Sequence, residues 1–175
     1  MDRLPFRATQ LAGSYDTLPH LPVTILLDNI RSMYNVGSFF RTADAAGVER
    51  LLLTGITAYP PKSGIRKTAL GAEETVPWEQ TRDPLPLLDR LTANGHQIAA
   101  IETSVHAVDV FDWTPAFPVC LVFGHEVDGI RPEVAARCDT HVRIPMLGRK
   151  HSLNVATAGG VLIYELLRKY RVLAS

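Results

Sequence analysis

Residues 23–47 read VTILLDNIRSMYNVGSFFRTADAAG: an apolar run of strand length, a polar loop and then an amphipathic segment. The run is continuously apolar up to Asp28, which is typical of a strand covered on both faces in a parallel sheet. In the segment over 35–46, apolar side chains recur at the spacing of one helix face, and Gly47 follows as a natural helix end. The stretch therefore predicts a strand–loop–helix unit of an α/β protein.

The rest of the chain repeats this alternation. Further strands are predicted at 51–54, 97–101, 119–123 and 141–144, and further helices over 84–94 and 152–170. The last helix is apolar nearly all round over 161–167, which predicts burial against the sheet or a partner chain. Gly159 and Gly160 inside it predict the close passage of another backbone. We expect one α/β domain over 23–175, preceded by an N-terminal arm at 1–22.

Composition sets limits on function. The 175 residues carry 18 Lys and Arg against 18 Asp and Glu, so net charge neither supports nor excludes an RNA partner. No apolar run reaches the roughly 20 residues of a membrane span, and residues 1–14 lack the apolar core of a secretory signal, so we expect a cytoplasmic protein. Cys120 and Cys138 have no partners at metal-ligand spacing and are interpreted as structural.

The first polar constellation follows the strand that ends at Asp28. Asn35 opens the predicted helix and is interpreted as its N-cap, which would accept a backbone N–H. Arg41 lies in a helix of small and apolar residues and needs a partner. That partner is either a carboxylate in a structural ion pair or a phosphate brought by a substrate.

Two further constellations follow later strands. Residues 121–132 read LVFGHEVDGIRP, in which Gly124 would let a ligand approach the backbone and Glu126 would be exposed at a strand end. Residues 144–156 read IPMLGRKHSLNVA, a strand end and a basic loop before a helix for which Ser152 is the predicted N-cap. A helix N-terminus behind basic residues is a potential anion site.

Other site classes fit the sequence less well. Asp28, Asp44 and Glu126 are too scattered in sequence to indicate a metal site, and no metal is expected. The Gly-rich dinucleotide fingerprint is absent after the first strand. His151 and Ser152 are adjacent, so they do not indicate a nucleophile and its base.

In order and spacing, the three constellations resemble the SpoU/TrmH family of the SPOUT methyltransferase superfamily. The matching residues are Asn35 and Arg41, then Gly124 and Glu126, then the segment IPM…HSLNVA over 144–156. The segment 67–78 also looks like one common in that family. The resemblance covers roughly 22–171. His125 departs from it, because the family usually has Asn or Ser there.

The resemblance implies an α/β fold with a parallel sheet and a deep C-terminal trefoil knot, assembled as a homodimer. It implies S-adenosyl-L-methionine (AdoMet) as cofactor, held at Thr103, Gly124, Ile144, Met146, Ser152 and Leu153. The product would be a 2′-O-methylated ribose in tRNA or rRNA. Arg41 would act as base or as phosphate anchor, with the substrate oriented by Asn35, Glu126 and Asn154. The RNA would be held by basic side chains in or near the flanking loops: Arg31, Arg66, Lys67, Arg149 and Lys150.

Two other functions remain open for a chain with this pattern. One is a catalytically silent RNA-binding or assembly protein of the same fold, although its polar positions are intact. The other is a SPOUT enzyme that methylates a base nitrogen, although the third constellation favours ribose.

Overall fold

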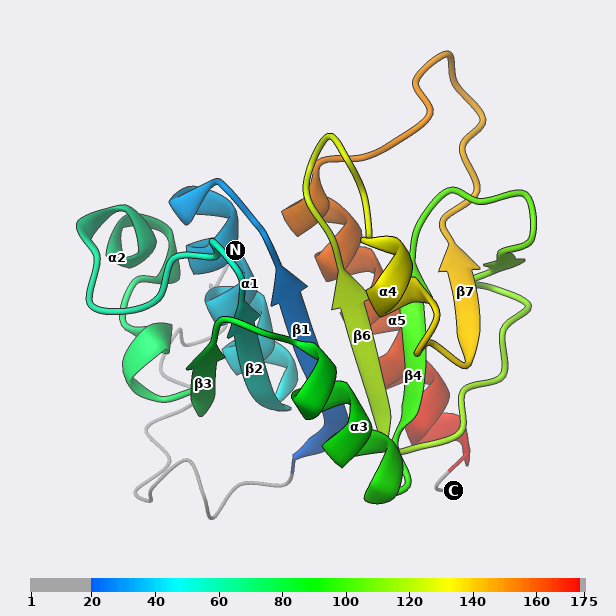
Figure 1. The fold of residues 1–175 in the computed structure, drawn as a ribbon, viewed down its shortest axis with the longest axis horizontal. Coiled ribbons are helices and arrows are strands. Elements are labelled where there is room, and N and C mark those ends of the chain that lie inside the picture. The colour runs from blue at the N-terminus through cyan, green and yellow to red at the C-terminus, as the bar shows by residue number, and fades with distance from the viewer. Residues whose placement is uncertain (1–19, 174–175) are drawn as a thin grey trace, which may run out of the picture.

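The structure is a computed structural model that describes residues 20–173. Its centre is a seven-stranded sheet with the order β3-β2-β1-β6-β4-β7-β5, in which every pairing is parallel (Figure 1). The strands are β1 (Leu21–Asp28), β2 (Val48–Thr54), β3 (Trp78–Thr81), β4 (Gln97–Ile101), β5 (Val108–Asp109), β6 (Val119–Phe123) and β7 (Thr140–Arg143). The predicted α/β class with a parallel sheet is confirmed.

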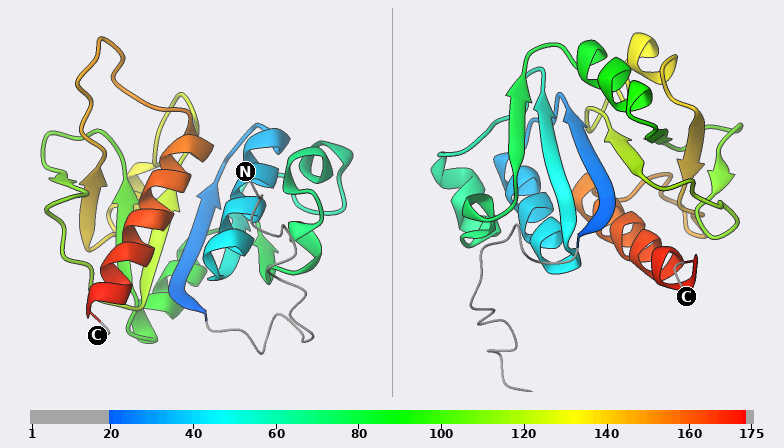
Figure 2. Two further views of the ribbon diagram at one scale, coloured as in Figure 1. Left: turned by 180° about the vertical axis from the view of Figure 1, so that it is seen from behind. Right: turned by 90° about the horizontal axis from the view of Figure 1, so that it is seen from below.

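Helices cover both faces of the sheet, and the strands supply apolar side chains to each. The helices α1 (Met33–Ala46) and α5 (Val155–Leu173) cover one face, and α3 (Leu85–Ala93) and α4 (Pro132–Ala135) cover the other (Figure 2). Alternate residues of one strand therefore enter different cores: Ile25 and Leu27 pack towards α1 and α5, whereas Leu26 packs towards α3. This two-sided burial is the physical reason for the unbroken apolar runs.

The first helix begins earlier than its sequence pattern predicts. Ser32, not Asn35, is the N-cap of α1, since the Ser32 side chain accepts the Asn35 backbone N–H over 3.3 Å. The predicted capping role of Asn35 is wrong, and its side chain is free for another partner. At the other end, Gly47 adopts φ +68° and closes the helix as predicted.

The last helix begins at Val155, so the prediction that Ser152 caps it is also wrong. Asn154 is the residue that accepts backbone N–H groups there, from Ala156 over 3.0 Å and from Thr157 over 3.2 Å. The short polar side chain of Asn154 therefore serves as the cap of this helix.

The two glycines inside α5 have different surroundings. A Cβ on Gly159 would stand 2.2 Å from the ring of Phe39, so a side chain of α1 approaches it, not the backbone that the sequence predicts. Gly160 has open space where its Cβ would stand. The Phe39 ring also contacts Phe123 edge-on, with centroids 5.0 Å apart, and so joins α1, β6 and α5.

Several elements lack a clear sequence signal. They are α2 (Ser63–Ala69), the short 3₁₀ helix η2 (Ala72–Glu74), β3 and β5. The single-turn α4 does have a signal, because it begins at Pro132, a residue that favours the first position of a helix. Helix α2 packs on α1 at Gly37, where a Cβ would stand 2.3 Å from the Ile65 carbonyl oxygen.

The N-terminal boundary differs slightly from the prediction. Strand β1 begins at Leu21, two residues before the predicted run, and residues 1–19 of the predicted arm lie outside the described residues. Within residues 20–173 there is no helix with the length and apolar character of a membrane span. The knot stays a prediction.

Candidate functional site

A pocket lies at the C-terminal edge of the central strands, where open α/β sheets bind their ligands. Its volume is about 320 Å³. It is lined by the end of β4, by the turn after β6, by the loop after β7 and by the start of α5. That loop, residues 144–154, projects beyond the rest of the molecule at the top of Figure 1.

All six residues predicted to bind a cofactor line this one pocket. Thr103 follows β4, Gly124 follows β6, and the other four belong to the loop after β7: Ile144, Met146, Ser152 and Leu153. Apolar neighbours that the sequence did not single out complete the lining: Ile101, Phe123, Ile130, Val155 and Ala158. The strands bring together lining residues that lie up to 57 positions apart, from Ile101 to Ala158, which sequence spacing alone does not reveal.

A chain of three polar side chains lies beside the pocket. The Asn35 side-chain amide donates to Glu126 Oε1 over 3.2 Å, and the Asn154 amide donates to Asn35 Oδ1 over 3.2 Å. One end of the chain, Glu126, lines the pocket, and Asn154 directly follows the pocket residue Leu153. Three of the four predicted catalytic residues are thus joined by hydrogen bonds.

Glu126 is held as an anion at the start of α1. Its carboxylate accepts the backbone N–H groups of Arg31 and Ser32 over 3.0 Å and 3.2 Å. Partial burial works to raise the pKa of Glu126, but these bonds, its own backbone N–H and the Asn35 amide outweigh that effect and lower the pKa below its usual value. A negative charge at a helix N-terminus is also favourable. Glu126 therefore fixes the position of Asn35 as well as carrying charge into the pocket.

The turn that carries Glu126 is closed by its own backbone. His125 and Gly129 exchange two backbone hydrogen bonds of 3.0 Å and 2.9 Å, and Gly129 adopts φ +73°. A Cβ on Gly124 would stand 2.4 Å from the Gly129 carbonyl oxygen. The protein chain itself therefore requires a glycine at position 124. The expected approach of a ligand to Gly124 stays a prediction.

His125 also stabilises this turn. Its Nδ1 accepts the backbone N–H groups of Val127 and Asp128 over 3.2 Å and 3.1 Å. The Asp128 carboxylate lies 3.0 Å from the same nitrogen, which would require a proton there. Because Asp128 is 81% exposed whereas both backbone N–H groups belong to the turn, we assign the hydrogen bonds of Nδ1 to the backbone.

Asp28, the last residue of β1, is a buried carboxylate with its own ion-pair partner. Asp28, which is 1% exposed, accepts two hydrogen bonds from the Arg131 guanidinium over 2.9 Å and 3.2 Å and one from Thr54 over 2.7 Å. The bonds with Asp28 raise the pKa of Arg131. Asp44 instead accepts from Thr75, 2.8 Å away. The three carboxylates weighed as metal ligands thus have separate partners, and residues 20–173 hold no group of three or more metal-ligating side chains.

Two side-chain pairs on the pocket wall have no sequence signal. Glu102 pairs with His141, and Arg143 pairs with Asp109. Glu102 and Arg143 both line the pocket. The pairs depend on the parallel registers of β4 with β7 and of β7 with β5, which join residues 39 and 34 positions apart.

Arg41, the fourth predicted catalytic residue, lies apart from the other three. It is exposed on α1 and does not line the pocket. Within residues 20–173 no carboxylate forms an ion pair with it, so a structural ion pair is the wrong interpretation. Arg41 is available to an external anion.

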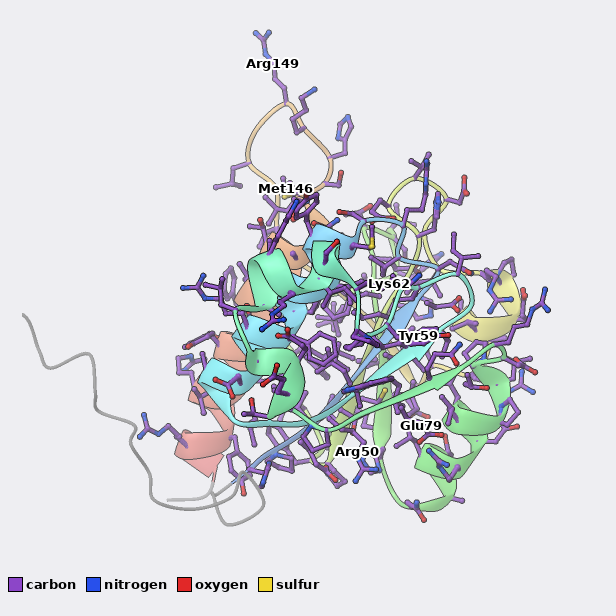
Figure 3. The ribbon with its side chains drawn as sticks, turned by 90° about the vertical axis from the view of Figure 1, so that its left-hand side faces the viewer. Arg50, Tyr59, Lys62, Glu79, Met146 and Arg149 are labelled. Carbon is purple, nitrogen blue, oxygen red and sulfur yellow. The ribbon has the colours of Figure 1, made fainter. Side chains whose placement is uncertain are left out.

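The predicted RNA-binding residues form two separate groups in one chain. Arg66 and Lys67 are exposed on α2, beyond β2 and β3 (Figure 1). Arg149 and Lys150 are exposed in the projecting loop, and Figure 3 shows Arg149 at its outer end. Arg31 precedes both groups in sequence; it is exposed in the loop before α1 and donates its backbone N–H to Glu126.

The two cysteines fit the structural interpretation. Cys120 is fully buried in β6, and burial strongly raises the pKa of its thiol. Burial also raises the pKa of Cys138, to about 12. Thiols with raised pKa values are poor nucleophiles at neutral pH.

Comparison with known proteins identifies the chain's relatives. The model of the SpoU rRNA Methylase family matches residues 22–164. A "Putative TrmH family tRNA/rRNA methyltransferase" of Staphylococcus haemolyticus is 31% identical over 149 residues, which cover 85% of this chain and 59% of that protein.

Solved structures agree with the sequence comparison. An AdoMet-bound rRNA methyltransferase from Sinorhizobium meliloti superimposes with a TM-score of 0.76 at 28% identity, over 86% of this chain and 60% of that one. A structure described for the 2-OH methylation of C/U34 on tRNA gives a TM-score of 0.77 at 26% identity, over 86% of this chain and 97% of that one. The chain spans only about three fifths of the first two relatives.

Proposed function

The chain belongs to the SpoU rRNA Methylase family, and from this premise we propose that it transfers the methyl group of AdoMet to a ribose 2′-hydroxyl of tRNA or rRNA in the cytoplasm. The observation that carries the proposal is the hydrogen-bonded chain Asn154–Asn35–Glu126 at the mouth of the pocket. Relatives described as acting on the 2-OH of tRNA and as binding AdoMet support it.

The pocket suits AdoMet in chemistry as well as in position. That cofactor has an adenine ring that suits an apolar slot, and Ile101, Phe123 and Ile144 offer apolar contact. It also has a net positive charge at neutral pH, which the carboxylates of Glu102 and Glu126 would favour. We propose that Thr103, Gly124, Ile144, Met146, Ser152 and Leu153 hold it, several of them through backbone groups.

The chemistry divides between the cofactor and the protein. When bound, AdoMet supplies an electrophilic methyl group on a sulfonium. The protein must then hold a ribose oxygen in line with that methyl group and accept the hydroxyl proton. Asn154 is exposed next to the pocket and has one amide hydrogen left for a ribose oxygen, while Asn35 and Glu126 fix its direction.

Arg41 is proposed to meet the RNA instead of the cofactor. Its exposed guanidinium lies outside the pocket lining and lacks a carboxylate partner among the described residues. A guanidinium of ordinary basicity is a strong phosphate ligand and a poor proton acceptor. A phosphate anchor acts as the protonated guanidinium, whereas a base would first have to lose its proton.

We further propose that two copies of the chain form a homodimer through α5. Its outer face leaves Tyr164 50% exposed and Val161 half-buried, beside the open space at Gly160. A second copy would bury this surface and would place two sets of the α2 and loop cations around one RNA. Light scattering at micromolar concentration should give twice the chain mass of 19.3 kDa.

The function can be tested in cells of the source organism. Nucleosides of tRNA and rRNA from cells with and without the gene would be compared by mass spectrometry. The proposal expects one 2′-O-methylnucleoside to disappear with the gene. Loss of a base-methylated nucleoside would favour the base-nitrogen alternative, and no change in any nucleoside would favour a silent RNA-binding protein.

A further inference from the structure

The edge of the sheet opposite β5 carries an exposed aromatic pair outside the pocket. The rings of Tyr59 and Trp78 stack with centroids 6.2 Å apart and an angle of 29° between their planes. Tyr59 is 41% exposed and Trp78 is 38% exposed. The Lys62 ammonium lies 5.9 Å from the centre of the Tyr59 ring. We call these three side chains the edge platform.

The edge platform and the basic helix α2 lie on the same face of the sheet. In the register of β2 with β3, Trp78 lies next to Leu51, whose side chain belongs to the core on the α1 side of the sheet. Trp78 therefore faces the side that α2 occupies, and Lys62 is the N-cap of α2. Figure 3 views this edge, with Tyr59 and Lys62 below the projecting loop that carries Arg149.

The charge around the edge platform suits an anion. Lys62 and the α2 residues Arg66 and Lys67 are exposed, and no carboxylate within residues 20–173 forms an ion pair with them. The neighbouring Glu79 is already paired with Arg90 over 2.7 Å. Exposed aromatic faces next to unpaired cations are the combination that binds single-stranded nucleic acid, through base stacking and phosphate contact.

The segment that carries Tyr59 is hydrogen-bonded to the end of β1 and to the loop before α1. That loop in turn binds Glu126, one of the three residues in the hydrogen-bonded series Asn154–Asn35–Glu126. The Thr57 hydroxyl donates to the Leu27 carbonyl over 2.9 Å and accepts the Ile30 N–H over 3.0 Å. The Asn29 side chain accepts the Ile56 N–H over 3.1 Å. The next residues, Arg31 and Ser32, donate to Glu126. A nucleotide on the edge platform would therefore have a fixed position relative to Asn35.

From these contacts we propose that the edge platform binds an unpaired nucleotide of the substrate RNA, with its base stacked on Trp78 and Tyr59 and a neighbouring phosphate on Lys62. This inference deepens the proposed function, since it names the part of that RNA which lies away from the methylated ribose. The substrate must then offer a single-stranded nucleotide at a set distance from its target.

The two tryptophans of the chain allow a test that does not require methyl transfer. Trp113 is 5% exposed, so the Trp113→Phe protein reports on Trp78 alone, and the Trp78→Phe protein reports on Trp113 alone. Each is titrated with single-stranded oligo(U) and oligo(A) decamers. The proposal expects saturable quenching in Trp113→Phe, weakened by salt, and none in Trp78→Phe. Absence of quenching in Trp113→Phe would overturn it.

The affinities of variants for the decamers distinguish loss of base stacking on Trp78 from a general loss of folding. Trp78→Ala should raise the Kd for the decamers about tenfold, as loss of one base–aromatic stack does. Trp78→Phe should stay within about threefold because it keeps an aromatic face, and Phe111→Ala, an exposed ring elsewhere, should change nothing. An unchanged Kd in Trp78→Ala would refute the edge platform. Quenching in a protein that methylates no RNA would instead refute the proposed function alone.

Discussion

The side-chain amide of Asn154 donates to Asn35 Oδ1 over 3.2 Å and so joins residues that lie 119 positions apart. The same Asn154 side chain accepts the first N–H groups of α5. One residue thus fixes both the start of α5 and the direction of Asn35. Stability and activity can be separated at this position, because each depends on a different atom of the amide.

Substitutions of Asn154 should separate its two roles. Asn154→Asp keeps an oxygen for the helix cap but loses the amide donor, so we expect near wild-type stability and methyl transfer slower by on the order of 100-fold. Asn154→Ala should in addition lower the free energy of unfolding by about 1 kcal/mol. Urea unfolding and single-turnover methylation measure the two effects. Equal activity of Asn154→Asp and wild type would show that the donor is not needed.

Glu126 should make stability depend on pH in a definite direction. Its folded-state pKa is lowered, so its contribution is complete above the unfolded pKa of about 4.3 and is lost as the pH falls through the folded value. The difference in unfolding free energy between wild type and Glu126→Gln should therefore be larger at neutral pH than below about pH 4. A difference that stays constant with pH would mean that the charge of Glu126 does not stabilise the fold.

Arg41→Ala should abolish methyl transfer and leave AdoMet affinity within about threefold, because Arg41 lies outside the pocket lining. Arg50→Ala, a change of another exposed arginine, is the control and should be active. Calorimetry with S-adenosylhomocysteine, alone and with RNA, measures the affinity. Methylation near the wild-type rate in Arg41→Ala would exclude both roles proposed for this residue.

Removal of Arg131 should destabilise the fold strongly. Asp28 is 1% exposed and would lose the only cation that pairs with it among the described residues, so Arg131→Ala should cost about 3 kcal/mol in urea unfolding. Arg50→Ala breaks an exposed pair with Glu49 and should cost about 0.5 kcal/mol or less. Similar costs for the two variants would contradict the assigned burial of the Asp28–Arg131 pair.

The sequence predicts the central strands well because burial on both faces leaves a strong apolar signal. The strands over 97–101 and 119–123 have the predicted bounds. The edge strand β3 was missed, since it reads WEQT and has a half-exposed, mixed pattern. The start of α5 was misplaced because Ser152 and Asn154 are both good caps, and only the backbone geometry selects Asn154.

The site could be predicted only where its residues come from contiguous motifs. Asn35, Glu126 and Asn154 each belong to such a motif, and the structure adds the hydrogen bonds between them. The Glu102–His141 pair could not be predicted, because it depends on the register of Ala100 with His141 between β4 and β7. The exposure of Arg41 depends on how α1 packs against its neighbours, which its sequence neighbours did not reveal.

The central claim is methyl transfer to a ribose hydroxyl, and one measurement tests it directly. Purified protein is incubated with AdoMet labelled in its methyl group and with total RNA from cells that lack the gene, and the RNA is digested to nucleosides for mass spectrometry. The account predicts that the label appears on the ribose fragment of one nucleoside, and that Asn35→Ala protein does not transfer it. Label on a base fragment, or no transfer by wild-type protein that binds both AdoMet and RNA, would contradict it.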